Sequence, residues 1–503
     1  MPENNSIPIA LVTSNDGKAA QFRRYAPAGS NASSIPPLFR EPGIKNEVEH
    51  RIPITNGYEY VAAISRGKFT EQRKKLQEQE GKEKDYAFLV SDAVAMVEKD
   101  GRQVAVNRDI SETEKQPHIE VINFKGVLTF VGAVTFGRKN GESVMTTLSY
   151  IDIPLSGPIK KFPDAGNIAE MTKIRNPDKP YVVGYIKPNV RDGKLVYEKV
   201  PAAQTLAFDA DEDGGEQINA RPFISGVTRD VIELAENTAL FDRKVAPIMQ
   251  ESVFQHPFNT LSFYAGFKES GFKTLLEYYR FLVAHPDEHF AKYGGNCTLF
   301  ILDLYRELQQ IGVDSSVAVC STAIPIHDLG HGALIANENG QDFFLDPGLS
   351  FAWPIPISRK VPIFPSTIDE GKMVMLNVGF VDADGNPDIM ILKGDKKHVL
   401  KGKKRVNLCE FKDMMPQVLT ELHDVRSKLK VDYHNPKGQK LASVVVDKER
   451  GTVDMQFGDT TLSNLSVNQV ICDPVLQADL TEGFGQYGIP FKSILDQLKL
   501  YQS

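Results

Sequence analysis

A cysteine in the second half of the chain has the setting of a reactive thiol. Cys297 follows the turn-forming stretch Tyr293-Gly294-Gly295-Asn296, and the residues after it have the apolar spacing of a helix. A helix N-terminus lowers the pKa of a thiol, because exposed N–H groups and the positive end of the helix dipole stabilise the thiolate. The sequence therefore predicts that Cys297 is a nucleophile.

A base and an orienting carboxylate follow the cysteine along the chain. His331 opens the strand-like run HGALIA, and Asp346 closes the next run, FFLDPG, after a turn at residues 337–340. An antiparallel hairpin across that turn would bring both side chains together. The imidazole would then face the thiol, and the carboxylate would fix the orientation of the ring. His327, four residues before His331, is an alternative base.

This pattern resembles the arylamine N-acetyltransferases, in which Arg-Gly-Gly-x precedes the cysteine and the aspartate stands fifteen residues after the histidine. His331 and Asp346 are also fifteen residues apart, and Asp346–Ser350 (Asp-Pro-Gly-Leu-Ser) is similar to the family's Asp-Val-Gly-Phe-Gly. Residues 353–357 and 481–489 are similar to later segments of the family. The resemblance covers residues 246–503.

The resemblance implies an α+β cysteine-triad module in which Cys297, His331 and Asp346 are catalytic. Acetyl-CoA or another acyl-CoA would be the acyl donor, and an amine would be the acceptor. Lys292-Tyr293 stands where arginine is usual before the glycines, and Thr298-Leu299 replaces an aromatic–glutamate pair, so the arylamine acceptor is not implied. A thiol peptidase or amidase of the transglutaminase-like group and a degenerate ligand-binding protein are the alternatives.

The first part of the chain holds a second candidate site. The apolar run Ile9–Thr13 predicts a strand that leads through a polar turn into a helix, where backbone N–H groups and Lys18 would face a phosphate. Asp92 follows the apolar run Tyr86–Val90, at the strand end where α/β sheets bind ligands, and with Glu49 it could hold Mg²⁺. The alternative is an N-capped helix with a solvated lysine and a surface aspartate.

These residues resemble the inosine triphosphate pyrophosphatase and Maf superfamily of nucleotide pyrophosphatases. Its opening signature, Thr-x-Asn-x-x-Lys-x-x-Glu-Phe, is met by Thr13, Asn15, Lys18 and Phe22, and a helix ending in Lys68 is similar to a Maf helix. The resemblance spans residues 7–245 and implies an α/β module with a mixed sheet that cleaves a nucleoside triphosphate to release pyrophosphate. The residues that it implies are Thr13, Asn15, Lys18 and Lys68 for the nucleotide and Asp92 and Glu49 for Mg²⁺.

The elements that must position these residues are expected in two blocks, 1–245 and 246–503. The expected strands cover residues 9–13, 86–90, 128–136, 145–153, 317–320, 333–336 and 342–345. The expected helices cover residues 58–80, 275–284, 299–308 and 491–500. The proline-rich stretch 353–365 is expected to be a loop or an edge strand.

Composition narrows the functional classes. The chain has 503 residues, 41% of them hydrophobic and 24% charged, which suggests a globular protein of two or three domains. A net charge of −7 disfavours nucleic acid, so the expected partners are small molecules. No apolar stretch reaches the length of a membrane span, and no signal peptide is recognisable. The four cysteines are scattered, which favours a reducing compartment, and we expect the cytoplasm.

Overall fold

The computed structural model divides the chain into two compact units. Unit 1 comprises Met1–Leu240, Ser358–Phe380 and Met390–Lys397, and unit 2 comprises Phe241–Ile357, Val381–Ile389 and His398–Ser503. The structure describes residues 7–13, 16–26, 32–38, 57–99, 102–105, 126–141, 144–155, 182–191, 194–201, 209–210, 216–217, 221–321, 331–358, 363–369, 372–381, 387–393 and 396–503. Unit 1 thus takes in two segments that lie beyond residue 245 in the sequence.

Unit 1 is built around a mixed sheet. Its helices are α1 (Asp16–Tyr25), α3 (Gly57–Glu80) and the first part of α6 (Arg221–Gln255). Its strands are β1 (Ile9–Val12), β2 (Ala32–Ile35), β3 (Ala87–Lys99), β4 (Arg102–Ala105), β5 (Val127–Arg138), β6 (Val144–Pro154), β7 (Val182–Arg191), β8 (Lys194–Pro201), β9 (Asp209–Ala210), β10 (Glu216–Gln217), β16 (Phe364–Asp369) and most of β17 (Lys372–Val381). Strand β1 runs parallel to both β2 and β3, whereas β3, β5, β6, β16 and β17 are joined by antiparallel pairing in that order.

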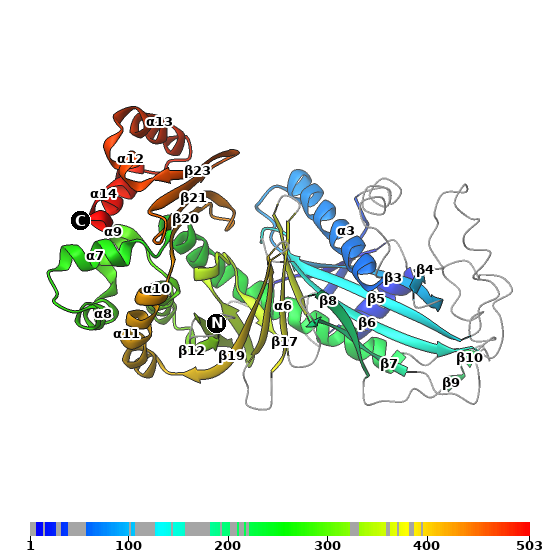
Figure 1. The fold of residues 1–503 in the computed structure, drawn as a ribbon. Coiled ribbons are helices and arrows are strands. Elements are labelled where there is room, and N and C mark those ends of the chain that lie inside the picture. The colour runs from blue at the N-terminus through cyan, green and yellow to red at the C-terminus, as the bar shows by residue number, and fades with distance from the viewer. Residues whose placement is uncertain are drawn as a thin grey trace. The chain divides into compact units, whose positions relative to one another are not determined.

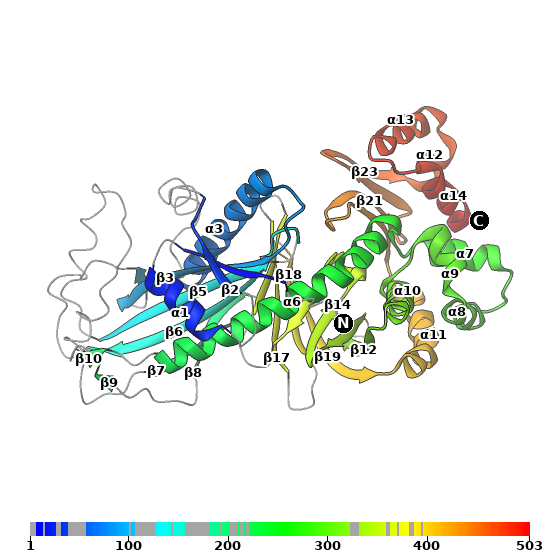
Figure 2. The same ribbon diagram turned by 180° about the vertical axis from the view of Figure 1, so that it is seen from behind.

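Helices cover both faces of this sheet, as the two ribbon views show, with α3 on one face and α1 and α6 on the other (Figures 1 and 2). The alternation of side chains along β1 explains the arrangement. Ile9 and Leu11 share a buried cluster with Phe22 of α1, whereas the intervening Ala10 shares one with Phe69 of α3. A strand that is buried on both faces reads as a continuous apolar run, which is why residues 9–12 carry no polar side chain.

Unit 2 contains two antiparallel sheets. Its helices are the rest of α6, α7 (Ser262–Ser270), α8 (Leu275–Ala284), α9 (Pro286–Tyr293), α10 (Cys297–Gln310), η3 (Pro347–Leu349), α11 (Leu408–Val425), α12 (Val467–Cys472), α13 (Pro474–Gly485) and α14 (Phe491–Gln502). Its strands are β11 (Phe258–Asn259), β12 (Asp314–Ser321), β13 (His331–Glu338), β14 (Gln341–Leu345), β15 (Ile355–Ile357), most of β19 (Lys396–Val406), β20 (Lys428–His434), β21 (Lys440–Asp447), β22 (Thr452–Phe457) and β23 (Thr460–Ser466). Strand β18 (Pro387–Lys393) is divided between the units.

Each sheet of unit 2 has its own core. One sheet has the order β19-β12-β13-β14-β15 and packs against α8, α10 and α11. The other has five strands in the order β11-β20-β21-β22-β23 and packs against α12, α13 and α14. The short strand β11 comes from the sequence before α7, whereas the other four strands of this second sheet follow α11.

The expected helices and strands are present, and the chain is mixed α/β. Stretch 353–365 contains β15, at the end of the strand order of its sheet, as the prolines predicted. Its last two residues, Phe364 and Pro365, differ from the prediction, because they begin β16, which pairs with both β6 and β17. One prediction is wrong: β3 does not end at Val90 but continues to Lys99. Val94 and Met96 are buried like Val90, so the two-residue alternation continues and places Asp92 within the strand.

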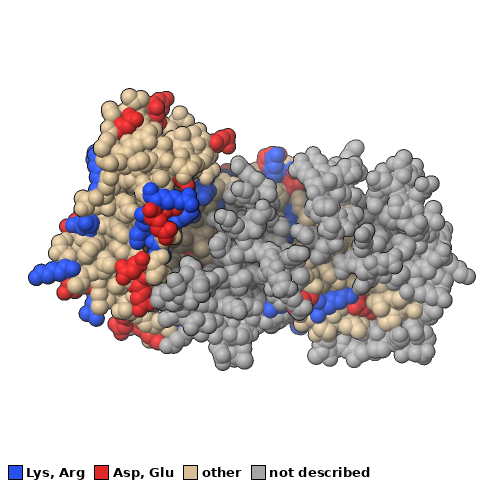
Figure 3. All heavy atoms as spheres, viewed as in Figure 1, with Lys and Arg blue, Asp and Glu red and all other residues tan. Residues whose placement is uncertain are grey.

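The described surface mixes charges of both signs. On the face drawn in Figure 3, the Lys and Arg side chains of unit 2 lie beside Asp and Glu side chains. Across the described residues, no helix has the length and hydrophobicity that crossing a membrane would require.

Candidate active site

Cys297 is the first residue of α10, where the sequence placed it. The side chain of Asn296 caps the helix by accepting from the backbone N–H groups of Thr298 and Leu299, at 3.0 and 3.4 Å. The turn before it needs glycine, because Gly294 has φ = 72° and a Cβ there would lie 2.2 Å from the carbonyl oxygen of Pro257. These local features put the thiol at the positive end of a helix.

His331 and Asp346 lie side by side on the predicted hairpin. Strands β13 and β14 pair antiparallel across a tight turn in which Asn339 and Gly340 both have positive φ. His331 Nε2 lies 2.6 Å from Asp346 Oδ2, and both side chains are largely buried. Because Nε2 is engaged by the carboxylate, Nδ1 is the ring nitrogen that remains for the thiol of Cys297.

The loop after β14 fixes the carboxylate and touches the cysteine. Asp346 Oδ1 accepts from the backbone N–H of Leu349 at 3.1 Å, so both carboxylate oxygens are engaged. A Cβ on Gly348 would lie 2.8 Å from Cys297 Cα and 3.4 Å from Asp346 Oδ1. Glycine at this position therefore lets the loop lie directly against the first turn of α10.

The three groups shift one another's titration. Burial by itself would raise the pKa of the Cys297 thiol, but the charge of His331, a hydrogen bond with that side chain and one with the Gly332 backbone outweigh it, and the pKa is lowered. Burial would lower the pKa of His331, but the charges of Asp346 and Cys297 and hydrogen bonds to both raise it well above its usual value. The site therefore favours a thiolate beside an imidazolium.

The alternative base that the sequence offered, His327, lies outside the described residues. The buried residue that the sequence reasoning missed is Asn259 of β11, whose side chain donates 2.8 Å to the carbonyl oxygen of Tyr293, four residues before the cysteine. Two polar residues, Asn259 and Thr260, stand between the apolar Phe258 and Leu261, but the partner of Asn259 could not be named from the sequence.

The residues predicted for the phosphate site of unit 1 are only partly described. Asn15, Glu49 and the side chain of Lys18 lie outside the described parts, and Thr13 donates its backbone N–H to the Ile35 carbonyl at 3.1 Å. Lys68 Nζ lies 3.1 Å from Asp92 Oδ2, so two of the predicted residues pair with each other.

This ion pair changes the interpretation of Asp92. The carboxylate was predicted to lie beyond a strand end and to hold Mg²⁺. It lies instead within β3, and the ammonium group of Lys68 contacts its Oδ2 atom. Among the described residues, no group of three or more His, Cys, Asp or Glu side chains is arranged to hold a metal ion.

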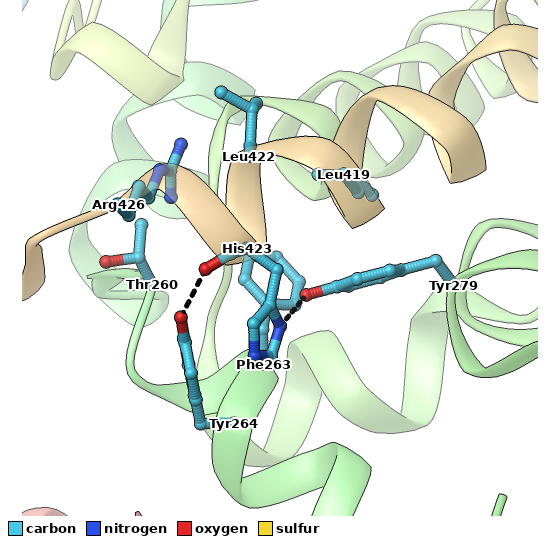
Figure 4. Close-up of a pocket in the computed structure, with 8 residues that line it drawn as sticks. All are labelled: Thr260, Phe263, Tyr264, Tyr279, Leu419, Leu422, His423 and Arg426. Carbon is cyan, nitrogen blue, oxygen red and sulfur yellow. Dashed lines mark hydrogen bonds between the residues drawn. The ribbon is translucent and has the colours of Figure 1, made fainter. Parts of the chain in front are cut away.

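A small pocket in unit 2 lies elsewhere, between α7, α8 and α11 (Figure 4). Tyr279 Oη lies 2.9 Å from His423 Nδ1, and Tyr264 Oη donates to the His423 carbonyl at 2.6 Å. The pocket has room for about one water molecule. None of the three triad residues lines it, so we treat it as a packing feature.

Comparison with known proteins gives a likeness to solved structures but no match at the level of sequence. No protein-family model matches the sequence, and no curated protein matches it. The arylamine N-acetyltransferase from Mycobacterium abscessus is 15% identical, with 52% of this chain and 89% of that chain covered at a TM-score of 0.35. Arylamine N-acetyltransferase C from Bacillus anthracis is 14% identical, with 48% and 91% covered at 0.33. An arylamine N-acetyltransferase from Bacillus cereus, described as having a Cys-His-Glu catalytic triad, is 12% identical, with 46% and 87% covered at 0.32. At TM-scores this low the likeness carries no argument about function, which has to come from the geometry of the side chains.

Proposed function

We propose that unit 2 is a cysteine-dependent acyltransferase. The observation that carries the proposal is the chain of contacts from Cys297, at a helix N-terminus, to His331 and on to Asp346 at 2.6 Å. A thiolate, a proton carrier and a carboxylate that orients the carrier are the groups that nucleophilic acyl transfer requires. An acyl-CoA thioester is the proposed donor, and an amine is the proposed acceptor.

The first half of the reaction would load the cysteine. The Cys297 thiolate attacks the thioester carbonyl carbon, a new C–S bond forms, and the C–S bond to the donor breaks. The departing donor thiolate takes the proton of the His331 imidazolium and leaves as a free thiol. Asp346 fixes the orientation of the His331 ring throughout, because its other oxygen accepts a hydrogen bond from the backbone N–H of Leu349.

The second half would unload it. The amine nitrogen attacks the carbonyl carbon of the acyl-cysteine and gives a proton to neutral His331. Cys297 leaves as a thiolate beside the re-formed imidazolium, and an amide is released. No water is required at any step, which distinguishes the transferase from the peptidase or amidase alternative.

Intact-mass spectrometry tests this proposal. The full chain mixed with acetyl-CoA should gain one acetyl group, and addition of an amine should remove it. The Cys297→Ala variant should gain none, whereas Cys409→Ala, which alters an exposed thiol, should behave like wild type. Hydrolysis of acetyl-CoA or of peptides without an adduct would favour the hydrolase alternative. A protein that neither forms an adduct nor shows a reactive thiol would be a degenerate binding protein.

A second candidate function belongs to unit 1, which we propose binds a nucleoside triphosphate. The observation that favours it is the order β2-β1-β3, in which β1 lies between two parallel partners and leads into α1. Ligands of α/β sheets bind where neighbouring connections diverge at the carboxyl ends of such strands. Thr13 stands at this end of β1, with Asn15 and Lys18 next along the chain.

Calorimetry on the full chain, with and without magnesium, tests this second candidate beside an assay for pyrophosphate. Binding of a nucleoside triphosphate that Lys18→Ala weakens would support it, and binding by no nucleotide would contradict it. Turnover with Asp92 and Glu49 on Mg²⁺ is a further proposal from the resemblance, and it requires Lys68 to give up its contact with Asp92. Magnesium-dependent release of pyrophosphate would support that role.

A further inference from the structure

The loop before Cys297 is hydrogen-bonded to the buried side-chain amide of Asn259. Asn259 has no exposed surface, and its Nδ2 donates to the Tyr293 carbonyl at 2.8 Å and to Gln497 Oε1 at 2.9 Å. Its Oδ1 accepts from the backbone N–H of Ser262 at 2.9 Å. Every hydrogen-bonding atom of this side chain is thus engaged, and the partners come from α9, α14 and α7.

The backbone of the same loop is joined to the five-stranded sheet. Asn259 donates its N–H to the Gly295 carbonyl at 2.7 Å, and Gly295 donates its own to the Pro257 carbonyl at 3.2 Å. Strand β11 in turn pairs with β20, where Asn259 stands opposite Val431. Gly295, two residues before Cys297, is therefore hydrogen-bonded to the segment that pairs with β20.

The last residue of β20 holds the loop that carries Asp346. His434 Nε2 lies 2.9 Å from Ser350 Oγ, and His434 is buried. Ser350 adopts φ = 67°, a conformation rare for a residue with a side chain, and its N–H donates to the Pro347 carbonyl at 2.8 Å. Gly438, in the turn after β20, lies so close to the Ser350 carbonyl that a Cβ there would be 2.2 Å from it.

We propose that β20 positions the thiol site from both sides, with Asn259 and Gln497 holding the Cys297 loop and His434 holding the Asp346 loop. The inference rests on the proposed acyltransferase function of this site. None of these residues touches the reacting atoms, so they are positioning residues. Their importance follows from the narrow tolerance of such sites, in which reacting groups must be held within about half an ångström.

The test measures how fast iodoacetamide alkylates Cys297 as a function of pH, read by mass spectrometry of the cysteine peptide. Gln497→Met removes the acceptor of Asn259, and His434→Leu removes the partner of Ser350. Each should slow alkylation near neutral pH about tenfold and move the midpoint of the pH profile upward by about one unit, because the thiolate loses alignment with the imidazolium. His434→Gln, which keeps a nitrogen near the Nε2 position, should restore most of the wild-type profile.

Two matched variants separate positioning from general destabilisation. Gln477→Met removes a glutamine whose amide donates to the Val470 and Ile471 carbonyls, and His423→Leu removes a histidine bonded to Tyr279. Both should lower the thermal unfolding midpoint without moving the pH profile of Cys297. If His434→Leu does not fold, Ser350→Ala removes the same hydrogen bond from the other side.

The outcomes distinguish this inference from the function on which it rests. A wild-type Cys297 that reacts no faster than exposed thiols would contradict the acyltransferase proposal itself. A fast wild-type Cys297 whose profile is unchanged in Gln497→Met and His434→Leu would leave that proposal standing and overturn the role of β20. A displaced profile in Gln497→Met and in His434→Leu, together with a near-wild-type profile in His434→Gln and in both controls, supports that role.

Discussion

Cys297 is 8% exposed, yet the pKa of its thiol is lowered, and that combination depends on its neighbours. Burial alone stabilises the protonated thiol, so a buried cysteine is ordinarily inert. Here the imidazole of His331 and the backbone of Gly332 stabilise the thiolate, and Asp346 raises the pKa of His331. The reactivity of the thiol should therefore be opposite to what its exposure alone would suggest.

This contrast gives a prediction for alkylation at neutral pH. Cys297 should react with iodoacetamide at least about tenfold faster than Cys409 or Cys472, although both of these are exposed. His331→Ala should abolish the advantage, because it removes the charge and the hydrogen bond that lower the thiol pKa. The measurement is the rate of label incorporation at each cysteine peptide. Equal rates at the three thiols of the folded protein would show that the thiolate–imidazolium pair does not form.

At the scale of elements, the site depends on two turn positions at which a side chain larger than glycine's would clash with the backbone. Gly294 takes a left-handed φ before the thiol helix, and Gly348 brings the loop after β14 against that helix. These glycines connect three elements, α10, β13 and β14, into one site. The loop with Gly348 has the closer contact to the reacting groups, so it is the more informative position for a substitution.

Gly348→Ala should therefore damage the site. The added methyl group would lie 2.8 Å from Cys297 Cα, which is backbone and cannot move aside without shifting α10. We expect a loss of stability of about 1–3 kcal/mol and at least about tenfold slower acetylation of Cys297. Gly485→Ala is the matched control, because nothing lies within 4 Å of a Cβ at that position. Wild-type acetylation in Gly348→Ala would mean that the loop can move away at little cost.

A half-buried histidine in α9, the helix before α10, should limit acid stability. The ring of His289 is hydrogen-bonded at both nitrogens, with Nδ1 3.3 Å from Tyr278 Oη and Nε2 3.2 Å from Ser262 Oγ. Burial together with the charge of Lys292 lowers its pKa to about 4. The unfolded chain takes up a proton on this residue below about pH 6.5, whereas the folded protein takes it up only near pH 4. Stability should accordingly fall as pH decreases through that window.

His289→Gln should flatten this dependence by about 1–2 kcal/mol between the two pH values, measured by urea unfolding across the range. His285→Gln, which alters an exposed histidine one helix turn away, should leave the slope as in wild type. An unchanged slope in His289→Gln would assign the acid sensitivity of unit 2 to other groups.

Some of the pairings between elements were predictable from the sequence, and others were not. The hairpin of His331 and Asp346 was predictable, because apolar runs on either side of an Asn-Gly turn specify antiparallel pairing and the register follows. The pairing of Asn259 with Gln497 was not, because nothing local relates residues so far apart in the chain. The end of β3 was misplaced because Asp92 was interpreted as a turn residue, whereas Lys68 of α3 neutralises it within the strand.

At the scale of the whole molecule, unit 1 is not a continuous stretch of sequence. Strand β16 pairs with β6, with Phe364 opposite Thr146, and Ile363 belongs to the buried cluster that contains β1 and the first part of α6. A division at residue 245 describes the chain as two consecutive modules, but it separates β16 from its sheet. Unit 1 thus includes β16, a strand that lies outside residues 1–245.

A fragment of residues 1–245 should consequently be less stable than unit 1 in the full chain. Removing residues 358–397 leaves the Met145–Thr146 edge of β6 without its partner and uncovers core residues packed against Ile363. We expect a lower thermal unfolding midpoint and more aggregation for this fragment, measured by calorimetry and light scattering. Joining residues 358–397 to it through a flexible linker should restore both. A fragment as stable as the restored one would show that β16 is dispensable.

The pairing of β6 with β16 also sets an order for synthesis. A ribosome releases the chain from its first residue onward, and continuous domains can fold as soon as they emerge. Residues 1–240 emerge first, but their sheet receives β16 only after residues 241–357 of the other unit have been made. The residues of β6 that pair with β16 therefore lack this partner while residues 241–357, which include the three triad residues, are being translated. A chaperone would be most useful during this interval.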